Sequence, residues 1–196
     1  MDSRLTKFTT HDLVMVGIFN AALVLFFYGT TIVLHFIPFL WGAMDPVLCF
    51  VLAPIFLLMV VRVPKTGVLT IHGFIIGIVH AAIGWWPGLV AGLVGGTVAD
   101  AFAVAAGGYK KKTVVYGSIS LFFLVKIALF YSPMYLFMYL PWFDDVLSMW
   151  PKESIEKYTV VYVIGVLAFS LIACFAGLLF GQRMLSRHFK NSSVAC

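Results

Sequence analysis

The chain has 196 residues, of which 62% are hydrophobic and 11% are charged, whereas a soluble domain usually carries roughly 25% charged residues. This composition excludes a soluble globular protein, because too little polar surface is available to face water. The formal net charge of +5 does not indicate nucleic-acid binding, since the basic residues lie at the ends of apolar runs. The three cysteines have no paired spacing, so neither a disulfide framework nor a zinc site is predicted.

The apolar runs predict a single transmembrane domain over residues 1–196. A helix needs about 20 apolar residues to cross the roughly 30 Å hydrocarbon core of a bilayer. The first run carries Asn20 and is longer than a signal-peptide core, so we interpret it as a retained helix. The expected fold is an all-α membrane protein, a bundle of six transmembrane helices. These helices are predicted over residues 12–36, 46–63, 67–83, 88–106, 113–140 and 155–184.

The basic residues predict the topology of this bundle. They lie at every second helix boundary, whereas the turns over residues 39–45 and 85–88 contain no lysine or arginine. By the positive-inside rule the basic boundaries face the cytoplasm, which places both chain termini inside. The boundary residues are Arg4, Lys7, Arg62, Lys65, Lys110, Lys111, Lys112, Arg183, Arg187 and Lys190.

All five tryptophans fall on the predicted outer side, and two interpretations stay open. Tryptophans commonly form an interfacial belt at the lipid headgroups. A cluster of aromatic rings on outer loops would equally suit a cap over a pocket for a flat, partly apolar solute. The residues are Trp41, Trp85, Trp86, Trp142 and Trp150.

Lys126 lies near the middle of the predicted fifth helix, where a lysine costs roughly 2.5 to 3.5 kcal/mol on insertion scales. One hypothesis is that its side chain extends outward or pairs with Asp45 or Asp144. The other is that it faces a pocket and binds a carboxylate or phosphate of a ligand. Both hypotheses turn Lys126 away from lipid.

Four further polar residues interrupt the apolar runs. His80 is near the outer end of its helix and is a candidate ligand contact, while His72 is expected to form an interhelical hydrogen bond. Asn20 is interpreted as a packing residue or, alternatively, a pocket contact. Asp100 is expected to pair with a basic residue near the cytoplasmic end, and the alternative is a role in transport or coupling.

Small residues recur at spacings of four, which predicts close helix crossings. The sets are Gly73, Gly77 and Ala81; Gly92 and Gly96; Ala173, Gly177 and Gly181; and Gly17 and Ala21 in the first helix.

Motifs for catalysis are absent from the sequence. No G-x-x-x-x-G-K-[ST] occurs, so the chain is not expected to hydrolyse ATP. No H-E-x-x-H or G-x-S-x-G occurs either, and we expect neither an enzyme nor a cofactor. The competing hypothesis is a multi-pass membrane enzyme or metal-dependent processing factor that uses His72, His80 and Asp100. A third is a membrane scaffold without a ligand.

Three stretches carry a resemblance to a known family: HDLVMVGIFNAAL, PVLCFVLAPIFLLMVVRVPKTGVLTI and GLVAGLVGGTVADAFAVAAGGYKKK. The chain resembles the substrate-binding S components of energy-coupling factor (ECF) vitamin importers, and more narrowly the group called Trep_Strep. The resemblance implies a six-helix bundle in a prokaryotic plasma membrane, with both termini inside. It also implies capture of a vitamin or similar micronutrient from outside. The implied partners are a transmembrane T component and two ATPase subunits that supply the energy.

The resemblance also assigns a partner surface. Family helix 1 docks on the T component through an Ala-x-x-x-Ala face, and the matching positions here are Gly17 and Ala21.

We expect an outward-facing pocket closed by the turns over residues 39–45 and 85–88. Its predicted substrate contacts are Trp41, Trp85, Trp86, Trp142, His80, Lys126 and Asn20.

Overall fold

The computed structural model describes residues 7–37, 43–136 and 160–188, and these residues form six α-helices. The predicted all-α fold is therefore confirmed. The first four helices begin and end within two residues of the predicted bounds. Five of the six are long and apolar enough to cross a membrane, whereas α3, with 15 residues, is shorter. The helices are α1 (Thr10–His35), α2 (Met44–Arg62), α3 (Val68–Ala82), α4 (Pro87–Ala105), α5 (Lys112–Leu136) and α8 (Val160–His188).

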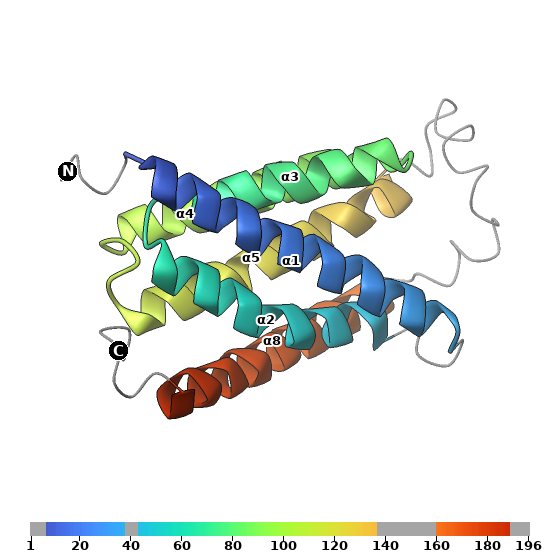
Figure 1. Cartoon of the computed structure of the whole chain (residues 1–196). Helices are drawn as coiled ribbons and strands as arrows, with labels where there is room; N and C mark the ends of the chain where they lie inside the picture. The colour runs from blue at the N-terminus through green and yellow to red at the C-terminus, as the bar shows by residue number, and fades with distance from the viewer. Residues whose placement is uncertain (1–6, 38–42, 137–159, 189–196) are drawn as a thin grey trace.

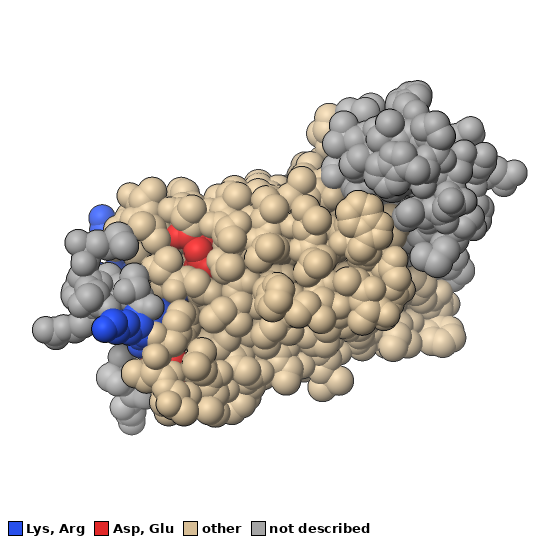
Figure 2. All heavy atoms as spheres, turned by 90° about the horizontal axis from the view of Figure 1, so that it is seen from above, with Lys and Arg blue, Asp and Glu red and all other residues tan. Residues whose placement is uncertain are grey.

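The helices pack side by side along one common direction (Figure 1). The largest interfaces join α3 to α4, α2 to α8 and α4 to α5, while α1 lies against α2 and touches α3. Helix α1 begins and α8 ends at the same end of the bundle. Lysine and arginine side chains gather at that end, which we call the basic end (Figure 2). The start of α1 and the end of α8 therefore lie on one side of the bundle, and the assignment of that side to the cytoplasm stays a prediction from the positive-inside rule.

Large apolar side chains cover the outside of the bundle as well as its interior. Phe56 and Phe122 are fully buried in the core, yet Leu25 is 71% exposed and Phe169 is 66% exposed. In water such a surface would drive aggregation. It is the surface expected of a protein surrounded by lipid tails.

Glycines allow two helix pairs to approach at the backbone. Gly73 of α3 faces the backbone of Gly92 of α4, and a Cβ at Gly96 would lie 2.5 Å from the carbonyl oxygen of Leu69. On the other side of the bundle, a Cβ at Gly177 of α8 would lie 2.5 Å from the carbonyl oxygen of Phe50 in α2. The close crossings predicted from these spacings are confirmed.

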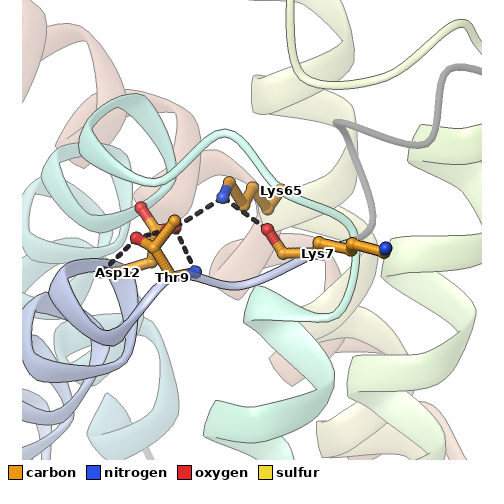
Figure 3. A network of polar contacts seen from close by, with 4 residues as sticks. All are labelled: Lys7, Thr9, Asp12 and Lys65. Carbon is orange, nitrogen blue, oxygen red and sulfur yellow. Dashed lines mark hydrogen bonds and ion pairs between the residues drawn. The ribbon is translucent and has the colours of Figure 1, made fainter.

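A polar network at the basic end holds the start of α1 (Figure 3). Thr9 caps the helix, because its hydroxyl accepts from the Asp12 amide at 3.2 Å while the Asp12 carboxylate accepts from the Thr9 amide at 2.8 Å. Lys65, between α2 and α3, donates to Asp12 at 2.5 Å and to the Lys7 carbonyl at 2.6 Å. Lys65 therefore joins the N-terminal end of α1 to the α2–α3 connection.

Candidate functional site

Aromatic rings and one lysine come together between α1, α3 and α5, toward the end of the bundle opposite the basic end. The His80 ring centroid lies 5.4 Å from that of Phe27, 6.2 Å from that of Tyr28 and 5.6 Å from that of Phe130. The Lys126 ammonium lies over the Phe27 ring, 4.6 Å from its centroid. Lys126 and Phe130 are four residues apart, which places them on one face of α5. We call Phe27, Tyr28, His80, Lys126 and Phe130 the aromatic–lysine cluster.

Lys126 is only partly compensated by the protein. No carboxylate of the described residues lies within 4.0 Å of its ammonium, and Asp45 attracts it only from a greater distance. The Asp45 carboxylate instead accepts a hydrogen bond of 2.5 Å from the Tyr131 hydroxyl. The predicted direct pair with Asp45 is therefore wrong, and Asp144 lies outside the described residues.

The contact with Phe27 stabilises Lys126 by less than the free-energy cost of placing a lysine inside the membrane. A cation over an aromatic ring gains about 0.5 to 2 kcal/mol, while a lysine at this depth costs roughly 2.5 to 3.5 kcal/mol. The contact with Phe27 thus leaves part of the cost of Lys126 uncompensated. An anionic ligand placed beside the ammonium would supply the missing interaction.

The two histidines of α3 have different partners. His72 Nδ1 lies 2.8 Å from Asn20 Oδ1, and the Asn20 amide donates to the Val16 carbonyl at 2.8 Å. The expected interhelical hydrogen bond of His72 is therefore confirmed. Asn20 lies seven residues before Phe27, about 10 Å along α1, and it bonds within the protein. His80, by contrast, belongs to the aromatic–lysine cluster.

The predicted tryptophan contacts are placed as follows. Trp85 is only 6% exposed, and its ring centroid lies 5.6 Å from that of Phe130. Trp86, at the start of α4, is 42% exposed. Trp41 and Trp142 lie outside the described residues. The structure thus brings Trp85 against Phe130 of the aromatic–lysine cluster, and the Trp85 backbone amide donates to the His80 carbonyl at 2.9 Å.

Phe27, Tyr28 and Phe130 belong to the cluster but were missed in the sequence. With 19 phenylalanines and eight tyrosines in the chain, an aromatic residue in an apolar run is not distinctive. Only the i, i+4 spacing from Lys126 to Phe130 carried a signal. The contacts of Phe27 and Tyr28 depend on how α1 is rotated against α3.

Asp100 binds the N-terminal turn of α3. Its carboxylate accepts from the Thr70 amide at 2.8 Å, from the Thr70 hydroxyl at 2.7 Å and from the Tyr109 hydroxyl at 2.5 Å. Burial, together with the nearby Asp100 carboxylate, raises the pKa of Tyr109, so the phenol stays protonated and donates. The expected basic partner of Asp100 is therefore wrong. The free backbone amides and the partial positive charge at the N-terminus of α3 stabilise the Asp100 carboxylate in place of a basic side chain.

We expect Asp100→Ala to destabilise the protein more than Tyr109→Phe. The first change leaves Thr70 and Tyr109 without their acceptor, whereas the second removes one of three donors. We expect losses of about 3 and about 1 kcal/mol respectively. Thermal unfolding of the detergent-solubilised variants measures both. Equal stability of Asp100→Ala and the unchanged protein would contradict the capping role.

The residues of the metal-dependent alternative are not brought together. His72 bonds to Asn20, His80 lies in the aromatic–lysine cluster, and Asp100 binds Thr70 and Tyr109. In the part of the chain that the structure describes, no three His, Cys, Asp or Glu side chains form a group that could hold a metal ion.

The α1 face that carries Gly17 and Ala21 points outward. Both residues are exposed, and a Cβ at Gly17 would meet no atom within 4 Å. Their neighbour Ile18 is 59% exposed. Unlike Gly73 and Gly96, Gly17 is therefore not needed for packing among the described residues.

A shallow apolar groove lies elsewhere on the outside, on α1 and the start of α2. It encloses about 520 Å³ and has a single polar side chain, Thr30, in its lining. Such a surface suits a lipid acyl chain better than a polar solute. Its lining residues are Leu25, Phe26, Gly29, Thr30, Val33, Leu34 and Val47.

Comparison with known proteins agrees with the membrane assignment. Residues 10–191 match the model of a family described as "Hypothetical bacterial integral membrane protein (Trep_Strep)". No curated protein and no solved structure matches the chain. The family match covers nearly the whole chain and all six described helices. The chain therefore belongs to the Trep_Strep family of bacterial integral membrane proteins.

Proposed function

We propose that this chain is the substrate-binding subunit of an ATP-driven importer of the ECF type, in the bacterial plasma membrane. It captures a vitamin or similar small micronutrient from outside. It delivers this solute through a T component, with two ATPase subunits supplying the energy. The chain itself catalyses no reaction.

The observation that carries the proposal is the surroundings of Lys126. A lysine inside a helix bundle, beside an aromatic ring and without a carboxylate within 4.0 Å among the described residues, is costly to keep. An anionic solute that stacks on aromatic rings would compensate it. Ionisable groups inside the transmembrane helices mark substrate pathways in membrane proteins.

The two alternative functions, a scaffold and a metal-dependent enzyme, do not account for the surroundings of Lys126. A scaffold without a ligand has no use for a partly compensated ammonium between α1 and α5. A metal-dependent enzyme would need His72, His80 and Asp100 in one site, and these residues have separate partners.

Native mass spectrometry tests the proposal. We expect protein gently purified from its own host to carry a small molecule and to co-purify with one membrane subunit and two ATPases. Protein that repeatedly carries neither a small molecule nor these subunits would favour the scaffold.

We expect Gly17→Leu to abolish co-purification of the T component while leaving the fold intact. A leucine at this position would fill the space that a closely approaching helix needs, yet its Cβ would meet no atom within 4 Å. Co-purification and thermal unfolding are the two measurements.

Gly29→Leu is the matched control, because Gly29 is also an exposed α1 glycine with no atom within 4 Å of a Cβ. It lies toward the other end of α1. Loss of the partner in Gly29→Leu as well, or unchanged co-purification in Gly17→Leu, would refute this docking face.

A further inference from the structure

The aromatic–lysine cluster presents one strong donor and one acceptor beside the same ring. The Lys126 ammonium lies over Phe27 at 4.6 Å, and the His80 ring meets Phe27 edge to face at 5.4 Å. A lysine can only donate hydrogen bonds. A ligand group next to Lys126 must therefore accept, and an anionic oxygen does so best.

His80 can accept a hydrogen bond from a ligand, whereas Lys126 can only donate one. Its Nδ1 lies 2.7 Å from the carbonyl oxygen of Ile76, which can only accept, so the proton sits on Nδ1. A second positive charge near Lys126 would be repelled, so the ring is neutral. Nε2 then carries a lone pair, and the described residues offer it no hydrogen-bond donor. His80 is only 4% exposed.

Tyr28 adds a third polar atom. Its hydroxyl is buried and has no hydrogen-bond partner among the described residues, and its ring centroid lies 6.2 Å from that of His80. Buried polar groups are normally hydrogen-bonded. The Tyr28 hydroxyl has no such partner in the described part of the chain, and it lies on the helix next to His80 and around the same rings as Nε2, which indicates a place where a polar ligand completes the bonding.

We infer that the solute is a flat heteroaromatic compound with an anionic group and, close to it, an N–H or O–H donor. The anionic oxygen binds Lys126 Nζ, and the donor binds His80 Nε2. The ring packs against Phe27 and Phe130. This assignment rests on the proposed function, and it adds that a purely anionic or purely apolar compound leaves one of the two groups unpaired.

A matched set of probes tests this chemistry. Indole-2-carboxylate has both the anion and the N–H donor. N-methylindole-2-carboxylate lacks the donor, and indole-2-carboxamide lacks the charge. The three corresponding pyrrole compounds are included in case the site is too small for an indole. Binding is measured by ligand-observed NMR and calorimetry on the full chain in nanodiscs of neutral lipid.

We expect the carboxylate with the free N–H to bind at least about tenfold more tightly than either matched compound, because the N-methyl compound loses the hydrogen bond to His80 and the carboxamide loses the charge that strengthens the bond from Lys126. Lys126→Met should remove the preference for carboxylate over carboxamide. Lys110→Met, on the exposed turn after α4, is the control and should keep both preferences.

Two His80 variants separate a bonding role from a packing role. His80→Gln keeps an acceptor near the position of Nε2, whereas His80→Asn keeps only the part of the side chain near Ile76. We expect His80→Gln to retain the preference for N–H over N-methyl and His80→Asn to lose it. Thermal unfolding confirms that both variants fold, and neither residue is larger than histidine.

The inference and the proposed function fail in different ways. Equal binding of the N–H and N-methyl compounds, or no binding by any of the six, overturns the ligand class. So does a co-purified molecule that lacks either the anion or the donor, although that result supports the importer. Protein that carries no molecule and no ATPase subunits overturns the importer itself.

Discussion

Replacing Lys126 with methionine is expected to lower the affinity for the co-purified solute at least about tenfold and, at the same time, to leave the empty protein as stable or more stable. The affinity falls because a charge-assisted hydrogen bond of about 1.5 to 3 kcal/mol is lost. The stability does not fall, because a partly compensated charge is removed from the bundle while the unbranched apolar stem is kept. Calorimetry and thermal unfolding without ligand measure the two effects.

The paired measurement distinguishes a ligand-binding lysine from a structural one. A structural ion pair loses stability when one partner is removed, since the other charge stays buried and unpaired. Reduced stability with unchanged affinity would therefore assign Lys126 to the fold, through Asp45 or a residue outside the described ranges. Lys110→Met is expected to change neither quantity, because Lys110 is exposed on the turn before α5.

Gly96→Leu is expected to destabilise the protein by at least about 3 kcal/mol. A Cβ at this position would lie 2.5 Å from the Leu69 carbonyl oxygen and 2.7 Å from the Thr70 Cα. The obstructing atoms are backbone, so no side chain can rotate away. Helix α4 must move from α3, and the bond from Asp100 to the start of α3 then lengthens as well.

Unfolding of the purified protein in detergent, by heat or by denaturant, measures this loss. Gly165→Leu in α8 is the control, because a Cβ there meets no atom within 4 Å. The control should unfold like the unchanged protein. A Gly96→Leu variant with unaltered stability would show that α3 and α4 do not cross as closely as described.

The helices themselves could be predicted from the sequence because they depend on local properties. A run of about 20 apolar residues is long enough to span a bilayer, and residues such as Pro64 and Gly107 end such runs. The glycine spacings on α3, α4 and α8 also predicted close crossings correctly. A spacing of four residues places small side chains on one face whatever the neighbouring helix is.

The partners of the polar residues were decided only by the tertiary structure. Apolar residues surround each helix on all sides, so no polar face shows how a helix is rotated toward its neighbours. For this reason Asp100 was expected to pair with a basic residue and instead binds Thr70 and Tyr109. The position of Lys126 in an apolar helix identified it as costly from the sequence alone. That it shares the ring of Phe27 with His80 follows only from the packing of α1, α3 and α5.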